Sequence, residues 1–133
     1  MLEISHVSKT FNKGTITEKK ALTDINLKLE DGDFVTVIGG NGAGKSTLLN
    51  LIAGVHICDS GKIVLDGKDI TYMPEYKRAK YLGRVFQDPM VGTAANMEIE
   101  ENLAMAYRRG KNRTLAWGIK NKERTLYKEK LAL

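Results

Sequence analysis

Apolar and polar positions alternate through two stretches near the start of the chain. Between residues 21 and 30 polar residues separate Leu22, Ile25, Leu27 and Leu29, and this alternation predicts a half-buried β-strand. Residues 1–11 alternate only in places, which favours an edge strand. Phe34–Ile38 is a mostly apolar run rich in β-branched residues, and such a run predicts a buried strand of a parallel sheet.

The next segment changes from strand to helix periodicity. Residues 47–53 carry apolar positions at helical spacing, and Gly54 follows as a C-terminal stop. The turn at residues 59–61 leads into an apolar strand over residues 62–65, and Asp66-Gly67 is the signal of a tight turn back. The remaining predicted elements are a helix over residues 74–81 ended by Gly83, a strand over residues 84–87, a loop over residues 90–96, and helices over residues 98–109 and 120–133.

The glycine-rich run at residues 39–47, Gly-Gly-Asn-Gly-Ala-Gly-Lys-Ser-Thr, lies between the predicted parallel strand and the helix. Strand, glycine loop and helix is the context that the phosphate-binding pattern G-x-x-x-x-G-K-[ST] requires. Glycine allows the backbone N–H groups to turn inward around phosphate oxygens, and the helix N-terminus favours the same anion. The run therefore predicts a nucleotide phosphate site formed by Gly39, Asn41, Gly42, Ala43, Gly44, Lys45, Ser46 and Thr47.

Composition restricts the class of protein without identifying it. The 133 residues suffice for one modest domain, and 42% hydrophobic with 28% charged residues is ordinary for a globular protein. No apolar run approaches the length of a membrane span, and the start of the chain has no secretory signal pattern. The single cysteine, Cys58, cannot form an internal disulfide and fits a reducing compartment, and His6 and His56 have no metal-ligand spacing.

The net charge of +5 is concentrated near the end of the chain. Residues 108–130 contain nine Lys or Arg and two Asp or Glu, whereas the rest is close to neutral. A solvated helical face explains this excess as well as a docking surface near anionic headgroups or a membrane-protein partner does. Nucleic acid is the weaker interpretation, because no aromatic-and-basic array accompanies the charge.

Three segments around the loop together resemble the nucleotide-binding domain of ATP-binding cassette (ABC) transporters. Val7–Phe11 looks like the aromatic loop of that family, residues 59–70 look like the hairpin after the phosphate-loop helix, and Val85–Pro89 resembles the Q-loop. The resemblance implies that Phe11 stacks on adenine, and a flat apolar ring suits a purine. It also implies a MgATP site in which Lys45 contacts the β- and γ-phosphates, Ser46 and Gln87 contact Mg²⁺, and Lys45 and Gln87 act in catalysis.

The resemblance covers nearly the whole chain but only the first half of such a domain. The LSGGQ-type signature, a strand ending in Asp-Glu and the later switch histidine do not occur in the 133 residues, so the sequence is expected to be a truncated piece. The implied fold is α/β: a phosphate-loop NTPase core with an N-terminal antiparallel β-subdomain over residues 1–89, and the start of a helical subdomain over residues 90–133. Such a piece is expected to bind nucleotide weakly and to hydrolyse it negligibly.

By this resemblance the chain is an ATP-binding subunit that couples hydrolysis to solute transport, in the style of a bacterial importer. The implied partners are transmembrane permease subunits and a second nucleotide-binding domain in a head-to-tail dimer, with a solute-binding protein as a further candidate and no nucleic acid. The implied location is cytoplasmic, on the inner face of the membrane. Three alternatives stay open: a soluble ABC-type ATPase in translation or DNA repair, a GTPase or small-molecule kinase, and a nucleotide-binding module without catalysis.

Overall fold

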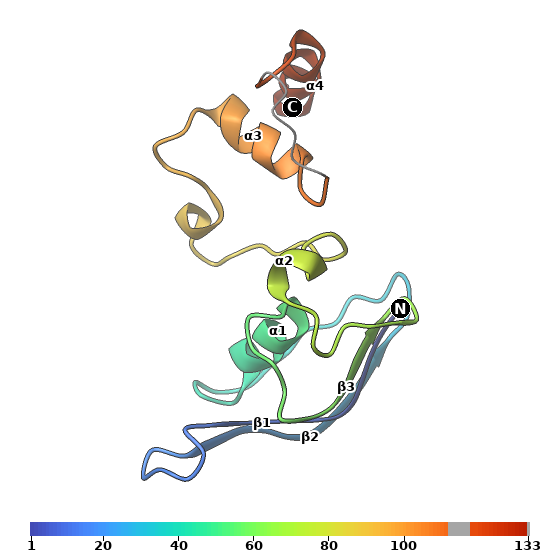
Figure 1. The fold of residues 1–133 in the computed structure, drawn as a ribbon, viewed down its shortest axis with the longest axis vertical. Helices are drawn as coiled ribbons and strands as arrows, with labels where there is room; N and C mark the ends of the chain where they lie inside the picture. The colour runs from blue at the N-terminus through green and yellow to red at the C-terminus, as the bar shows by residue number, and fades with distance from the viewer. Residues whose placement is uncertain (112–117, 133) are drawn as a thin grey trace. The chain divides into compact units, whose positions relative to one another are not determined.

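The computed structural model describes residues 1–111 and 118–132. The chain divides into two compact units, Met1–Arg78 and Ala79–Leu133 (Figure 1). The first unit contains every strand of the described residues together with the glycine-rich run, and the second is helical. The predicted phosphate site therefore lies in the first unit.

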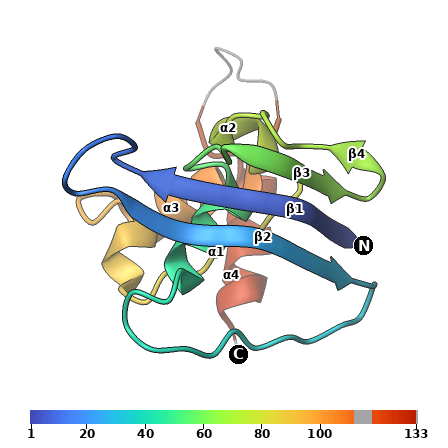
Figure 2. The ribbon, with the colours of Figure 1, turned by 90° about the horizontal axis from the view of Figure 1, so that it is seen from below.

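A four-stranded antiparallel sheet forms the framework of the first unit (Figure 2). Its order is β2 (Lys19–Leu29), β1 (Leu2–Phe11), β3 (Ser60–Leu65) and β4 (Lys68–Asp69). The prediction of an edge strand for residues 1–11 is wrong, because β3 pairs with the side of β1 that β2 leaves open. The predicted strand over residues 21–30 and the hairpin over residues 59–70 are confirmed, with the tight turn at Asp66-Gly67.

Helix α1 (Lys45–Ala53) packs on one face of this sheet. Its buried residues Leu48 and Leu51 join the apolar side chains of the strands in one core. Each such side chain contributes about 1.5–3 kcal/mol when it is fully buried. The other members of the core are Ile4, Val7, Leu22, Cys58, Ile63 and Ile70.

Arg78 is the last residue of the short helix α2 (Glu75–Arg78) and is 1% exposed. Its guanidinium contacts α1. Its Nη1 atom donates to the carbonyl oxygens of Leu51 at 2.7 Å and Ile52 at 2.9 Å, in the last turn of α1. Its Nε and Nη2 atoms donate to the carbonyl oxygens of Met73 and Thr71 at 2.7 and 2.9 Å. Burial lowers the pKa of the guanidinium, which stays the cation that a helix C-terminus favours.

Phe34–Ile38 does not form the predicted strand. The segment is extended but unpaired among the described residues, and Phe34 and Ile38 are 92% and 91% exposed. An apolar run becomes a buried strand only where neighbouring strands supply hydrogen bonds and helices cover both faces. No strand of the described residues pairs with this segment, so the pattern that predicts burial is not satisfied here.

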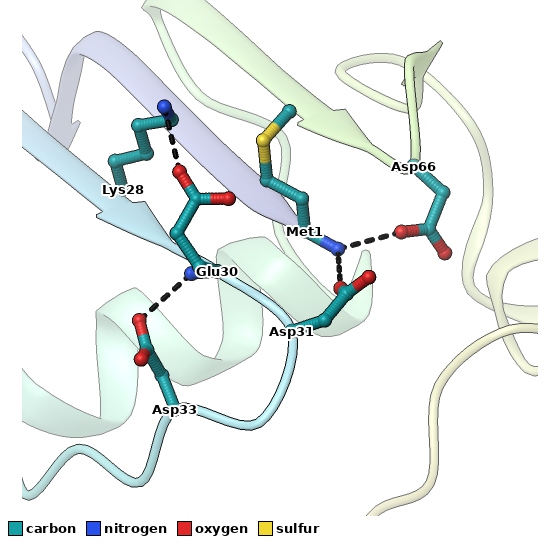
Figure 3. Close-up of polar contacts among 6 residues, drawn as sticks. All are labelled: Met1, Lys28, Glu30, Asp31, Asp33 and Asp66. Atoms are coloured by element: carbon teal, nitrogen blue, oxygen red, sulfur yellow. Dashed lines mark hydrogen bonds and ion pairs between the residues drawn. The ribbon is translucent and has the colours of Figure 1, made fainter.

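The amino group of Met1 binds the start of β1 to two turns of the first unit (Figure 3). It donates to the carboxylates of Asp31, which follows β2, and of Asp66, in the β3–β4 turn. These hydrogen bonds, with Asp31 first, raise the pKa of the amino group from 8.0 to about 10. Beside it the backbone N–H of Glu30 donates to Asp33 Oδ2 at 2.8 Å, so the turn that leads toward the phosphate loop is held at its start.

The second unit consists of η1 (Pro89–Gly92), α3 (Ile99–Tyr107) and α4 (Asn121–Leu131). The predicted helices over residues 98–109 and 120–133 are confirmed with slightly narrower bounds, and the predicted helix over residues 74–81 is reduced to α2. The predicted strand over residues 84–87 is wrong, because no strand of the described residues pairs with that segment. No helix in the described ranges is both long and apolar enough to cross a membrane.

Two ion pairs and one aromatic contact join α4 to α3 and to the turn that follows α3. Arg124 lies 3.0 Å from Glu100, and Arg108 lies 2.8 Å from Glu123. The rings of Tyr107 and Tyr127 meet edge to face with centroids 6.1 Å apart. The basic end of the chain is therefore partly neutralised within its own unit, as the interpretation of a solvated helical face expects.

Candidate functional site

The glycine-rich run folds as an exposed loop that enters α1 directly. Gly42 and Gly44 have φ angles of 81° and 87°, in the left-handed region that glycine adopts without strain. A Cβ atom built on Gly44 would lie 2.6 Å from the carbonyl oxygen of Ala21 and 2.8 Å from Leu22 Cδ2. Only glycine therefore lets the loop approach the backbone of β2 this closely, and the approach fixes the N-terminus of α1 against the sheet.

Lys45, the first residue of α1, folds back over the loop. Its Nζ atom donates to the carbonyl oxygens of Gly39 at 2.6 Å and Gly40 at 2.8 Å. Ser46 is exposed and Thr47 half-buried in the same first turn, which contains no acidic residue. An ammonium group and the positive end of a helix thus point to one place without a carboxylate to offset them, which suits an anion with several oxygens.

Phe11 lies at the end of β1 and is half-buried. Its ring meets the His56 ring edge to face, with centroids 5.2 Å apart, and Lys9 Nζ lies 5.7 Å from the Phe11 centroid. Lys9 is held in turn by Asp59 at 2.9 Å, and the N–H of Thr10 donates to the other carboxylate oxygen of Asp59 at 2.6 Å. The hydrogen bond from Lys9 and then that from Thr10 lower the pKa of Asp59.

This support of Phe11 was not predicted from the sequence. His56 and Asp59 lie some 45 positions downstream of the aromatic residue, and no local pattern connects them to it. The available signal was the predicted strand after residue 61, since a strand that pairs with β1 brings the loop before it to the end of β1.

Gln87, the remaining predicted site residue, belongs to the second unit. It is exposed at a bend of the chain, and the next residue, Asp88, accepts a hydrogen bond from the N–H of Met90 at 2.9 Å. Arg84 lies over the Phe86 ring at 4.6 Å from its centroid. The structure thus gives Gln87 an accessible amide, and its assignment to Mg²⁺ and to catalysis stays a prediction.

The loop, the helix that follows it and the antiparallel sheet beneath define a domain of the phosphate-binding-loop class. The family model described as "ABC transporter" matches residues 22–132. The chain belongs to the ABC transporter family, and the resemblance inferred from its motifs is confirmed.

Curated relatives extend this assignment to proteins named for transport. The chain is 42% identical to a tyrosine transport ATP-binding protein of Clostridioides difficile, over 95% of this chain and 50% of the relative. It is 39% identical to the spermidine/putrescine import ATP-binding protein PotA of Haemophilus influenzae, over 81% of this chain and 27% of the relative. It is 45% identical to the aliphatic sulfonates import ATP-binding protein SsuB of Bacillus cereus, over 77% and 38%. The matched residues thus span half the length of the first of these relatives and less than half of the other two.

Solved structures confirm the α/β cassette fold. A dimeric bacterial ABC transporter cassette superposes with a TM-score of 0.78 at 26% identity, over 99% of this chain and 56% of that one. A post-hydrolysis state of the same cassette, bound to ADP and Pi, gives 0.77 at 27% identity over the same shares. A nucleotide-free cassette gives 0.68 at 31% identity, over 86% of this chain and 43% of that one.

Proposed function

We propose that the chain binds MgATP through the loop at residues 39–47 and serves as part of the ATP-binding subunit of a bacterial ABC importer. The observation that carries the proposal is the close seating of Gly44 on β2, which aims the N-terminus of α1 and Lys45 at one anion site. Membership of the ABC transporter family and relatives named as import ATP-binding proteins support it.

Different residues would bind the phosphates and the adenine base of the nucleotide. The amides of Gly39, Asn41, Gly42, Ala43 and Gly44 and the first-turn residues Lys45, Ser46 and Thr47 would hold the phosphates. Because Lys45 donates to loop carbonyls at 2.6 and 2.8 Å, its ammonium is already at the loop and would exchange these bonds for phosphate oxygens. Phe11 would stack on adenine, with His56 fixing one edge of its ring.

Magnesium fits the donor chemistry of this site. Ser46 offers an exposed hydroxyl beside the loop, and oxygen ligands are those that Mg²⁺ prefers. We assign Ser46 as a magnesium ligand on this chemistry, and the assignment of Gln87 to Mg²⁺ rests on the resemblance of its segment to the Q-loop. When bound, the ion would neutralise charge on the phosphate oxygens.

Hydrolysis by the complete subunit is part of the proposal, and turnover by these 133 residues alone is not. Phosphoryl transfer depends on positioning a water and on neutralising charge from several sides. The sequence holds neither an Asp-Glu strand end nor a signature motif. Lys45 and Gln87 therefore supply only part of the catalytic arrangement, with residues 1–89 as β-subdomain and phosphate core and residues 90–133 as the start of the helical subdomain.

We further propose permease subunits and a second nucleotide-binding domain as partners, at the cytoplasmic face of the membrane. The relatives carry the names of tyrosine, polyamine and sulfonate systems, so they support a transport role and not one particular solute. A solved cassette described as dimeric supports pairing with a second domain.

Isothermal titration of the folded chain with MgATP tests the binding step. We expect measurable binding by the native chain, at least a 50-fold loss in Lys45→Ala from removing a charge-assisted contact, on the order of 2–3 kcal/mol, and no change in Lys122→Ala. Lys122 is an exposed lysine of α4 and controls for a general loss of positive charge. Equal affinity of the native chain and Lys45→Ala would remove the loop as the site, and phosphate release near that of a complete cassette would contradict the statement on turnover.

A further inference from the structure

The pairing of β1 with β2 changes register beside the phosphate loop. Lys9 pairs with Leu22 and Thr10 pairs with Lys20, so β2 advances by two residues where β1 advances by one. Ala21 is therefore the extra residue of a β-bulge. A bulge re-aims the side chains next to it, and bulges are over-represented beside functional sites.

The bulge directs β2 toward the loop at two points. The carbonyl of Ala21 and the side chain of Leu22 face Gly44, where a Cβ atom would lie 2.6 and 2.8 Å from them. Lys19, on the other side of the bulge, extends its ammonium to the tip of the loop. A Cβ atom built on Gly42 would lie 3.3 Å from Lys19 Nζ. The start of β2 thus presents a cation to the loop that the phosphate-binding pattern does not contain.

Lys19 has no competing anion in the described residues. It is exposed and forms no ion pair with a carboxylate in residues 1–111 or 118–132, whereas Lys9, Lys28 and Lys62 each have one. Lys19 is also the direct cross-strand partner of Phe11, and such partners lie on one face of a sheet. The free ammonium therefore lies on the face that carries the proposed adenine platform.

We propose that Lys19 is a second phosphate-binding cation and contacts the phosphate nearest the ribose. Lys45 reaches the loop from α1 at Gly39 and Gly40, and Lys19 reaches it from the sheet at Gly42. With the base on Phe11, the cross-strand neighbour of Lys19, the first phosphate after the ribose is the one that Lys19 meets, and the terminal phosphates are left to Lys45. This assignment rests on the proposed function.

Lys19→Ala tests the assignment, and Lys20→Ala is its matched control. Lys20 is the adjacent exposed lysine, and successive strand residues point to opposite faces, so its removal changes the net charge equally without reaching the loop. We expect Lys19→Ala to weaken MgATP and MgADP by the same factor, about 5- to 10-fold as for one exposed charge-assisted contact. Lys20→Ala stays within about 2-fold of the native chain, Lys19→Arg keeps most of the affinity, and the loss in Lys19→Ala shrinks as KCl is raised.

Each other outcome overturns the assignment. Lys19→Ala affinity within 2-fold of that of Lys20→Ala would make Lys19 a solvated lysine, and a loss for MgATP without one for MgADP would place its contact on the terminal phosphate. Equal urea midpoints of the two variants separate binding from folding. Failure of the native chain to bind MgATP overturns the proposed function itself. If the native chain binds and Lys19→Ala has the same affinity, only this inference is overturned.

Discussion

The two ends of α1 differ in how their free backbone groups are bonded. At the C-terminal end, Arg78 donates to the carbonyls of Leu51 and Ile52, and Gly54, with a φ angle of 86°, returns its N–H to Asn50 and Leu51. At the N-terminal end, Gly44 has no side chain to cap the helix, and no acidic residue occupies the first turn. A cation from the protein satisfies the negative end of the helix, and the proposed function assigns the positive end to an anion from outside it.

The difference shows how a short helix can keep an uncapped N-terminal end, the end that the proposed function assigns to the nucleotide. Free N–H groups at a helix N-terminus cost stability unless something else fixes the helix. For α1 that support comes from the buried guanidinium at one end, from Leu48 and Leu51 in the core, and from the contact of Gly44 with β2. The rigid closed end therefore lets the other end stay unsatisfied.

Breaking the closed end should have the largest effect. Arg78→Met keeps most of the side-chain volume but leaves the carbonyls of Leu51, Ile52, Thr71 and Met73 without this donor. Leu51 O keeps the N–H of Gly54, and the Met73 and Ile52 contacts are part-buried. Because each buried acceptor that loses its partner costs about 1–3 kcal/mol, we expect a loss of roughly 3–5 kcal/mol in the free energy of unfolding.

Urea unfolding followed by far-UV circular dichroism measures this loss. Arg109→Met, at an exposed arginine of the second unit, is the control and should stay within about 0.5 kcal/mol of the native chain. Equal stability of the two variants would show that the last turn of α1 does not depend on Arg78.

Filling the open end should cost somewhat less. In Gly44→Ala the new methyl group meets Ala21 O and Leu22 Cδ2 at 2.6 and 2.8 Å, on a backbone with a φ angle of 87°. Gly14→Ala is the matched control, because Gly14 has a φ angle of 79° and no heavy atom within 4 Å of its built Cβ.

We expect about 1–2 kcal/mol of destabilisation in Gly14→Ala from left-handed strain, and about 2 kcal/mol more in Gly44→Ala from the clash. Thermal unfolding of both variants gives the difference. If the two substitutions cost the same, the approach of the loop to β2 is not what requires glycine at residue 44.

The contact between His56 and Phe11 allows a finer test, because it joins the segment after α1 to the proposed adenine site. His56 follows α1 and meets the Phe11 ring edge to face at 5.2 Å. An aromatic pair contributes about 0.5–1.5 kcal/mol, so His56→Ala should weaken MgATP by roughly 2- to 10-fold through a less fixed Phe11 ring.

Titration with magnesium tripolyphosphate provides the control for that experiment, because this ligand has phosphates and no base. Its affinity should be unchanged in His56→Ala and in Phe11→Ala. A parallel loss for both ligands would mean that His56 acts on the phosphate loop and not on the ring.

The smallest expected effect is an acid-side change in stability at Asp59. Its pKa is lowered by hydrogen bonds from Lys9 and then from the N–H of Thr10, so the stabilisation is present above the ordinary value of 3.8 and is lost as the pH falls through the lower folded value. Because the Asp59 side chain is 39% exposed, the contribution should be below about 1 kcal/mol.

Asp59→Asn should therefore be less stable than the native chain near neutral pH, and the gap should narrow below about pH 4. Urea midpoints across this range measure it, and Lys9→Met, which removes the main cause of the shift, should behave alike. A gap that stays constant with pH would assign the effect to packing and not to charge.

Sequence patterns located the open end of α1 and the Gly54 stop at its closed end, but not the guanidinium of Arg78 that binds the closed end. The phosphate loop, β2, α1 and the β3–β4 hairpin follow from local spacing and turn residues. The burial of Arg78 could not be predicted, because a lysine- and arginine-containing stretch after a proline is typical of a solvated helix. The two acceptors that it meets in α1 lie more than 20 positions earlier. The same limit explains β1 and Phe34–Ile38, since whether a strand is internal, at an edge or unpaired depends on strands elsewhere in the chain.

The exposed segment Phe34–Ile38 also affects the self-association of the protein in solution. Large apolar side chains in an extended, unpaired segment are able to meet the same segment of another molecule. Salts that strengthen hydrophobic burial, such as ammonium sulfate, should raise light scattering from concentrated samples. Dilute samples with a mild non-ionic detergent should stay clear, which makes them the sensible condition for every titration that depends on a monomeric chain.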